Sequence, residues 1–226
     1  MLEKLRLKLA FIKLKSTLKK IKGQQFTPDE VMKLLFGKKL SLIRPWQYEE
    51  EFLNLLNQYN KLKPDYIMEI GTANGGTLFA HCKLASKNAT IISVDLPGGD
   101  FGGGYPDWKL PIYKEFSDIG QSLHLIRANS HEIQTLQNVK NVLKNNLLDY
   151  LFIDGDHSYK GVKKDFDVYS PLVKKGGHIV FHDIAYHKNS PCEVDKFWRD
   201  IKSSYNTIEF VKDKESGQFG IGIIIL

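Results

Sequence analysis

From residue 66 to residue 226, short apolar runs alternate with longer segments whose apolar residues recur at helical spacing. The apolar runs predict strands, and the periodic segments predict helices. We expect strands over residues 66–70, 90–95, 123–127, 150–154, 178–182, 207–211 and 219–226. We expect helices between them over residues 75–85, 133–143, 161–173 and 193–203. Strands that alternate with helices favour right-handed crossovers and a mainly parallel sheet.

The last two expected strands differ from the others, because a short polar turn joins them and no helix lies between them. The simplest connection of this kind is a hairpin, which makes one strand antiparallel at the edge of the sheet. The pattern therefore predicts an α/β fold, with a doubly wound, mostly parallel sheet of seven strands that ends in an antiparallel hairpin.

Three helices are expected ahead of the sheet, over residues 2–21, 28–37 and 46–62. The second follows Thr27, a typical N-cap, and begins with Pro28, which suits the first position of a helix. Pro64 stops the third helix. We therefore divide the chain into a basic amphipathic helix over residues 1–22, a helical extension over residues 23–64 and the α/β domain over residues 65–226.

The positive charge of the chain is concentrated in the first helix. The net charge is +6, and residues 1–22 carry eight lysines and arginines against one glutamate, a net of +7 that leaves −1 for the rest. Charge confined to one segment gives no support for a nucleic-acid-binding domain. The helix either packs on the domain or on a second subunit of a homo-oligomer, or is a partly frayed terminus. Alternatively, it attaches to an anionic membrane surface or to an acidic partner. Basic amphipathic helices are common, so we favour packing.

The composition is that of a globular protein, with 42% hydrophobic and 26% charged residues. Cys82 and Cys192 are the two cysteines, and their spacing is not that of a disulfide framework or a thiolate zinc site. No apolar run approaches the roughly 20 residues that cross a bilayer. Lysines interrupt the apolar residues at the N-terminus, unlike in a signal peptide. We expect a cytoplasmic protein, or one peripheral to the inner face of the membrane.

A glycine-rich turn follows the first strand of the sheet. In a doubly wound sheet this turn lies at the carboxyl edge, where ligands bind, and its glycines let a ligand approach the backbone. The turn contains Gly71, Thr72, Gly75, Gly76 and Thr77. It has neither the ending of a P-loop nor the full glycine pattern of a dinucleotide-binding turn.

Glu69 precedes the first glycine of this turn by two residues. A carboxylate at this place would repel a pyrophosphate, because like charges repel. It suits a ligand with a cationic or hydroxyl-bearing group, such as the amino group and sulfonium of S-adenosylmethionine. A tight structural turn without a ligand is the alternative.

Asp95 ends the second strand, 24 residues after Gly71. An acid at about this distance from the glycine-rich turn is typical of folds that bind ribose hydroxyls. This geometry serves NAD and S-adenosylmethionine equally well, and a solvated loop aspartate is the alternative. Asn129 and Ser130 follow the third strand, where such folds contact the adenine ring.

Acids and histidines follow the fourth and fifth strands. Asp154, Asp156 and His157 come after the fourth strand, and His182 and Asp183 come at the end of the fifth. The carboxyl ends of parallel strands lie at one edge of a sheet, so these side chains are expected at one crevice. Titratable groups gathered in this way indicate a functional site.

Residues 69–77, 154–159 and 176–183 together resemble the class I S-adenosylmethionine-dependent O-methyltransferases. The resemblance is to the family of cephalosporin-hydroxylase-like and macrolide-sugar methyltransferases, a relative of the catechol O-methyltransferase group. The loop over residues 95–99 and 101–105 is similar to bacterial members, and so is Gln47 with Glu50. The resemblance covers about residues 42–226, and seven strands with a final hairpin are typical of this Rossmann-like methyltransferase fold.

The resemblance implies that S-adenosylmethionine is the cofactor and that Asp154 lies beside its methyl group. Taken with the pattern of the strand ends, the residues expected to contact it are Gln47, Glu69, Gly71, Thr72, Gly75, Gly76, Thr77, Asp95, Asn129, Ser130 and Asp154. In metal-dependent relatives, residues at the positions of Asp154 and Asp183 bind Mg²⁺. Those relatives usually have an acid where this chain has His182, and Mg²⁺ prefers oxygen ligands. A softer divalent ion and no metal at all therefore both stay open.

The expected reaction is the in-line attack of a substrate hydroxyl on the sulfonium methyl group, helped mainly by positioning. His157 is the first candidate for the base that removes the hydroxyl proton, and His182 is the second. The acceptor is expected to be a sugar, a glycan or a small metabolite, with no nucleic acid partner. Two other functions stay open: an NAD(P)-dependent oxidoreductase on a similar sheet, and a catalytically silent partner subunit with a methyltransferase fold.

Overall fold

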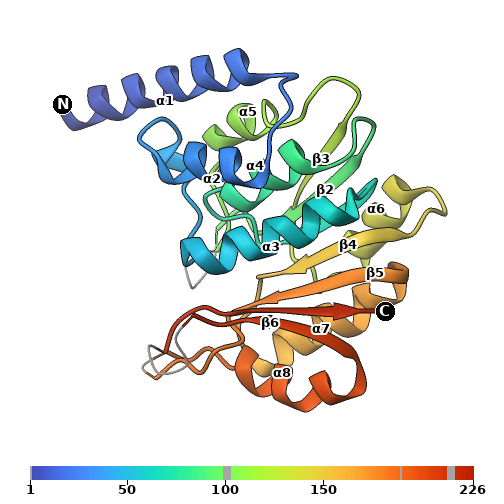
Figure 1. Cartoon of the computed structure of the whole chain (residues 1–226). Helices are drawn as coiled ribbons and strands as arrows, with labels where there is room; N and C mark the ends of the chain where they lie inside the picture. Colours follow the sequence, from blue (N-terminus) through green and yellow to red (C-terminus); the bar gives the residue numbers. More distant parts are fainter. Residues whose placement is uncertain (1, 99–102, 189, 213–216) are drawn as a thin grey trace.

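The computed structural model of the chain describes residues 2–98, 103–188, 190–212 and 217–226. Its centre is a sheet of seven strands in the order β3-β2-β1-β4-β5-β7-β6 (Figure 1). The strands are β1 (Tyr66–Ile70), β2 (Thr90–Asp95), β3 (Ser122–Arg127), β4 (Leu148–Ile153), β5 (Val173–His182), β6 (Asn206–Phe210) and β7 (Ile221–Ile225). β1 to β5 run parallel, and β7 runs antiparallel to β5 and β6. The predicted doubly wound sheet with a terminal antiparallel hairpin is confirmed.

The place of the antiparallel strand differs from the expectation. One of the two hairpin strands was expected to run antiparallel at the edge; the strand antiparallel to its neighbours is β7, which lies between β5 and β6, and β6 is the edge strand. Ile223 and Ile224 of β7 are buried on opposite faces of the sheet, whereas β6 exposes Asn206 and Glu209. Because an interior strand is covered on both faces, the strand that is apolar on both faces takes that position.

Helices cover both faces of the sheet. One face packs against α2 (Pro28–Phe36), α3 (Glu49–Leu62) and α4 (Gly76–Leu84). The other face packs against α6 (Ile133–Leu143), α7 (Tyr159–Tyr169) and α8 (Val194–Ile201). The remaining helices are α1 (Leu2–Ile21), α5 (Leu110–Tyr113) and the 3-10 turns η1 (Ser41–Ile43), η3 (Asp107–Lys109), η4 (Ser170–Leu172) and η5 (Lys202–Ser204).

Two elements begin earlier in the structure than the sequence predicted, each for a local reason. α7 begins at Tyr159, two residues earlier than expected, because the Ser158 side chain accepts a hydrogen bond from the Gly161 N–H and caps the helix. β5 begins at Val173, five residues earlier than expected. Its pairing with β4 shifts register before His178, so the Gly176-Gly177 turn of the sequence is an irregularity inside the strand.

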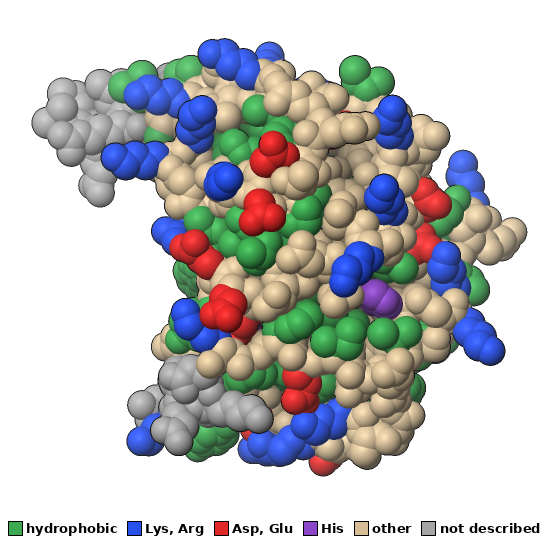
Figure 2. Space-filling model, in the orientation of Figure 1, with side chains coloured by type: hydrophobic (Ala, Val, Ile, Leu, Met, Phe, Trp, Pro, Cys, Tyr) green, Lys and Arg blue, Asp and Glu red, His purple; other side chains and the backbone are tan. Residues whose placement is uncertain are grey.

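α1 contacts the domain through its second half. Leu14 and Leu18 are buried in the core beside α2 to α4, and the Phe11 ring lies 4.5 Å from the Trp108 ring. Leu9 and Ile12 stay exposed. Figure 2 shows lysine and arginine side chains gathered over this helix, at the top of the view. Among the described residues, no helix combines the length and the apolar character that crossing a membrane requires.

Glu51 of α3 joins the helical extension to the terminal hairpin. Its side chain is buried, and its two oxygens accept hydrogen bonds from the backbone N–H groups of Lys212 and Gly220, at 2.7 Å and 3.0 Å. The neighbouring Glu50 is exposed and lies 4.0 Å from the Lys212 ammonium.

We expect Glu51→Ala to lower the free energy of unfolding by about 1–3 kcal/mol, because two backbone donors lose their acceptor. Glu50→Ala is the matched control and is expected to change little, since surface substitutions rarely do. Chemical denaturation of both variants measures the difference. Equal effects of the two substitutions would contradict this role of Glu51.

Candidate active site

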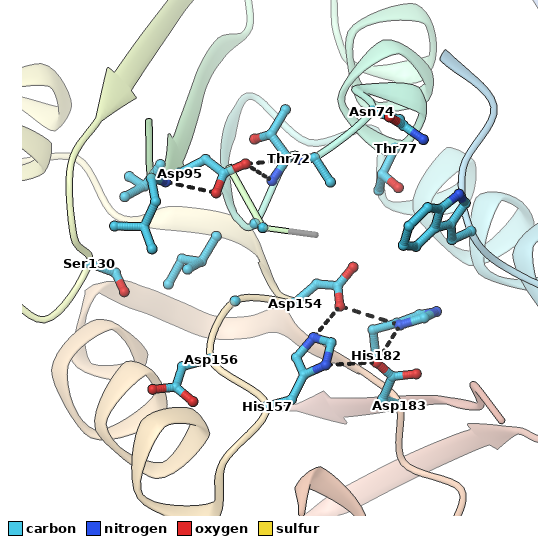
Figure 3. A pocket seen from close by; sticks show the side chains of 18 of the residues that line it. Thr72, Asn74, Thr77, Asp95, Ser130, Asp154, Asp156, His157, His182 and Asp183 are labelled. Carbon is cyan, nitrogen blue, oxygen red and sulfur yellow. Dashed lines mark hydrogen bonds and ion pairs between the residues drawn. The ribbon is translucent and has the colours of Figure 1, made fainter. Parts of the chain in front are cut away.

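The carboxyl ends of the parallel strands border a cavity of about 470 Å³. This volume is in the range of small-molecule sites, roughly 300–1,000 Å³. The structure brings together almost every residue predicted for the site. The predicted residues that line the cavity are Gln47, Gly71, Thr72, Gly75, Gly76, Thr77, Asp95, Asn129, Ser130, Asp154, His157, His182 and Asp183. Figure 3 shows Thr72 and Asp95 on one side and the histidines with Asp154 and Asp183 on the other.

Gly71 brings the end of β1 into contact with the end of β4. Its φ is +87°, and a Cβ at this position would lie 1.9 Å from the carbonyl oxygen of Asp154. The Asp154 N–H donates a hydrogen bond to the Ile70 carbonyl at 2.8 Å. A side chain at residue 71 would therefore push the glycine-rich turn away from Asp154.

Asp95 holds the glycine-rich turn against the loop that follows β2. One carboxylate oxygen accepts hydrogen bonds from the N–H groups of Thr72 and Ala73, at 2.9 Å and 2.8 Å. The other accepts from Leu96 and Gly104, at 2.7 Å and 3.0 Å. Burial raises the pKa of Asp95, and these four backbone donors oppose the rise. We call these four hydrogen bonds the Asp95 clamp. They hold the glycine-rich turn, which lines the cavity, against the loop after β2.

Glu69 is the predicted site residue that the structure places elsewhere. Its side chain is fully buried, and Oε2 lies 3.2 Å from the buried His81 Nδ1. Burial raises the pKa of Glu69, and the neighbouring His81 opposes the rise. Successive side chains of a strand point to opposite faces, so Glu69 points toward α4 and does not reach the cavity at the strand end.

Two aspartates and two histidines form a cluster at the ends of β4 and β5 (Figure 3). His157 Nε2 lies 3.3 Å from Asp154 Oδ1, and His157 Nδ1 lies 3.4 Å from Asp183 Oδ2. His182 Nδ1 lies 3.3 Å from the same two oxygens. We call these four residues the Asp–His cluster.

The charges of the Asp–His cluster stabilise one another. Burial alone would lower the pKa of His157, but Asp154 and Asp183 outweigh it and raise that pKa. The same carboxylates raise the pKa of His182 well above its usual value, again against the effect of burial. Burial would raise the pKa of Asp154 and of Asp183, and the two histidines lower both. The carboxylates thus favour the protonated form of the histidines, and the histidines favour the ionised form of the carboxylates.

His131 is a cavity residue that the sequence did not single out. Its Nε2 lies 3.3 Å from an oxygen of Asp165, whose side chain is fully buried on α7. The hydrogen bond to Asp165 raises the pKa of His131, against the effect of burial. Its position directly after Asn129 and Ser130 was a usable signal, because the same strand end carries all three. Phe219 of the hairpin also lines the cavity, and no sequence pattern pointed to it.

Two observations indicate that this cavity suits an adenosyl ligand. The glycine-rich turn gives the backbone close access, and Gln47 presents a buried Oε1 atom without a hydrogen-bond partner among the described residues. Buried polar atoms in native structures are usually satisfied, so Gln47 indicates a ligand contact. Residues 99–102, part of the glycine-rich loop noted in the sequence, lie outside the described residues.

Comparison with known proteins identifies the family. A family model for a methyltransferase domain matches residues 68–184, just over half of the 226 residues. The chain belongs to this methyltransferase family. The match spans β1 to β5 and contains both the glycine-rich turn and the Asp–His cluster. The prediction of a methyltransferase that uses S-adenosylmethionine is confirmed, and the oxidoreductase alternative is set aside.

This methyltransferase is similar to one viral protein in sequence and to bacterial enzymes in fold. It is 34% identical over 164 residues to protein R132 of Acanthamoeba polyphaga mimivirus, a stretch that covers 70% of each chain. An O-methyltransferase from Bacillus cereus, solved in complex with SAH, superimposes with a TM-score of 0.58 at 14% identity, over 93% of this chain and 97% of that one. These values show a shared fold.

A second similar structure is the MycE methyltransferase from the mycinamycin biosynthetic pathway, in complex with Mg, SAH and mycinamycin VI. The TM-score is 0.58 at 13% identity, over 89% of this chain and 55% of MycE. This methyltransferase thus spans about half the length of MycE, and the likeness again shows the fold.

Proposed function

We propose that this methyltransferase transfers a methyl group to a hydroxyl oxygen of a sugar, a glycan or a small metabolite. The observation that carries the proposal is that the Asp–His cluster and the glycine-rich turn line one cavity. A donor held by the turn and a group able to take a proton then face the same acceptor. The MycE complex with Mg, SAH and mycinamycin VI supports the macrolide-sugar branch of the family as the model for the acceptor.

In this proposal the donor lies between the clamp at Asp95 and the Asp–His cluster. S-adenosylmethionine supplies an already activated methyl group, so the protein's main task is to orient the two reactants. Asn129 and Ser130 are proposed to contact the adenine, and Gln47 and Asp154 the methionyl end. Asp95 lines the cavity and is proposed to contact the ribose hydroxyls, in addition to the four N–H donors that it already accepts from.

His157 is proposed as the proton acceptor for the hydroxyl. Both of its ring nitrogens lie beside carboxylates, which orient the imidazole and stabilise the proton that it takes up. His182 is the second candidate, and it is more deeply buried, at 4% exposure against 19% for His157. The more accessible ring is therefore the better placed to meet an acceptor.

Donor binding tests the proposal first. Calorimetric titration of the full chain is expected to show binding of S-adenosylhomocysteine and no binding of NAD. Incubation with S-adenosylmethionine and a panel of sugars, macrolides and phenols, followed by mass spectrometry, is then expected to show one added methyl group on a hydroxyl. Binding of NAD in preference, or methylation at nitrogen or carbon only, would contradict the proposal.

We expect His157→Gln to lower the rate of methyl transfer by about 10²–10⁴-fold, the usual contribution of a general base. The affinity for S-adenosylhomocysteine is expected to stay unchanged, because the substitution keeps the size and polarity of the side chain. His178→Gln, in the same sheet but outside the cavity, is the control for loss of a histidine. An unchanged rate in His157→Gln would contradict the role of His157 as general base and would leave His182 as the candidate.

The division of the chain at residues 22 and 64 remains a proposal about its organisation. Gln47 from the extension lines the cavity, so we propose that residues 23–64 belong to the catalytic unit. Residues 1–22 are proposed to be a packing helix, since Leu14 and Leu18 are buried.

A further inference from the structure

Ligand atoms for a metal ion converge at the Asp–His cluster. One atom each from Asp154, His182 and Asp183 lie within 4.8 Å of one another, and the same holds for His157, Asp183 and Cys192. His187 adds a third imidazole, with Nε2 3.3 Å from Asp183 Oδ1. Atoms this close can share one ion, because metal–ligand distances are roughly 2.0–2.3 Å.

The backbone at Asp183 is bent in a way that serves this convergence. Adjacent residues of a strand point to opposite faces, yet the side chains of His182 and Asp183 approach each other to 3.3 Å. Asp183 has a φ of +63°, in the left-handed region that aspartate adopts occasionally and most other residues besides glycine rarely adopt. Such conformations cluster at functional sites. The bend turns both side chains toward Asp154.

His182 is an independent sign of a ligand. Its side chain is only 4% exposed and lines the cavity, packed against the rings of Phe152 and Phe219. Nε2 has no hydrogen-bond partner among the described residues, and Nδ1 faces two carboxylate oxygens, with which it forms ion pairs when protonated. A metal ion bound to Nδ1 and the carboxylates would take the place of that proton, because a histidine binds metal through its neutral ring.

The donor set does not fit Mg²⁺, the ion present in the MycE complex. Mg²⁺ takes near-octahedral oxygen ligands, and here an imidazole nitrogen stands between the two carboxylates. Imidazole with carboxylate suits zinc, iron, nickel and similar ions. We infer that Asp154, His182 and Asp183 bind a divalent first-row transition-metal ion in preference to Mg²⁺. The inference rests on the proposed function, because the ion would lie in the cavity assigned to methyl transfer.

The test uses the full chain, freed of metal with a chelator and titrated with Co²⁺, Zn²⁺ and Mg²⁺. Co²⁺ is expected to bind with one ion per chain and to give visible absorption bands with nitrogen among its ligands. Loss of a supporting residue alone costs about 10–100-fold in metal affinity, so His182→Ala is expected to weaken Co²⁺ and Zn²⁺ binding by at least about 100-fold.

His182→Glu is the decisive variant, because it replaces the nitrogen ligand with oxygen. The ratio of Zn²⁺ affinity to Mg²⁺ affinity is expected to fall by at least about tenfold, following the preference of Mg²⁺ for oxygen. His178→Gln lies on the same strand, outside the cavity, and is expected to leave both affinities unchanged. An unchanged ratio in His182→Glu, or no binding of Co²⁺ or Zn²⁺ to the unmodified chain, would overturn the inference.

Titration with S-adenosylhomocysteine in the same samples separates this inference from the proposed function. Binding of S-adenosylhomocysteine without Co²⁺ or Zn²⁺ binding overturns the metal inference alone. Metal binding without S-adenosylhomocysteine binding overturns the proposed function instead. Thermal unfolding of His182→Ala and His182→Glu shows whether each variant is folded. A separate variant, His187→Ala, tests whether the third imidazole contributes to metal affinity.

Discussion

Gly71→Ala is expected to abolish binding of S-adenosylhomocysteine. A Cβ at residue 71 would meet the Asp154 carbonyl oxygen at 1.9 Å, and this neighbour is backbone that cannot rotate away. The positive φ adds about 1–2 kcal/mol of strain for any residue with a Cβ. The turn must therefore move away from β4, and both the donor cradle and Asp154 lose their positions.

Gly176→Ala is the matched control for this change. Gly176 has a φ of +79°, close to that of Gly71, but a Cβ there would meet nothing within 4 Å. It is expected to lose about 1–2 kcal/mol of stability and to keep its affinity for S-adenosylhomocysteine. Calorimetric titration and denaturation of both variants give the comparison. Retained binding in Gly71→Ala would show that the turn is not the donor cradle.

Asp95→Ala is expected to lose binding of S-adenosylhomocysteine by more than about 100-fold and to destabilise the fold. Four backbone N–H groups lose their acceptor at once, and hydrogen bonds to charged groups contribute about 1.5–3 kcal/mol each. Rehydration of the loop recovers part of this, so the expected loss of unfolding free energy is about 3 kcal/mol or more. Asp95→Asn keeps one acceptor oxygen and is expected to lie between the two.

Asp107→Ala controls for the loss of a carboxylate on the same side of the molecule. Asp107 is 83% exposed and pairs with Arg127, so its removal is expected to change stability and donor affinity little. Titration calorimetry and chemical denaturation are read together. If Asp95→Ala binds the donor as well as Asp107→Ala does, the clamp has no part in the site.

The strand ends were predictable from the sequence because parallel strands place their carboxyl ends at one edge. Asp154, His157 and His182 needed no knowledge of packing, since the order of strands and helices alone brings them to that edge. The same reasoning placed the antiparallel strand at the edge of the sheet, where the structure has β6. A hairpin pattern gives the direction of the two strands, but burial on both faces decides which of them lies inside.

The sequence pattern did not determine the direction in which individual side chains point. Glu69 was expected in the cavity because it stands next to the glycine-rich turn, yet the alternation of the strand turns it toward His81. The bend at Asp183 breaks the same alternation and brings a side chain into the site. The position of His131 could have been inferred from the strand end that it shares with Asn129 and Ser130, but its pairing with Asp165 of α7 joins distant segments and has no local pattern.

The hydrogen bonds of Glu51 have a consequence for attempts to trim the protein. The backbone that Glu51 holds at Gly220 adjoins Phe219, which forms part of the cavity wall. A fragment that starts at residue 65 would retain every strand, but it would miss Gln47 and the carboxylate that anchors this wall. The proposed catalytic unit therefore extends beyond the sheet, and we expect a shortened version built for crystallography or engineering to need a start upstream of residue 47.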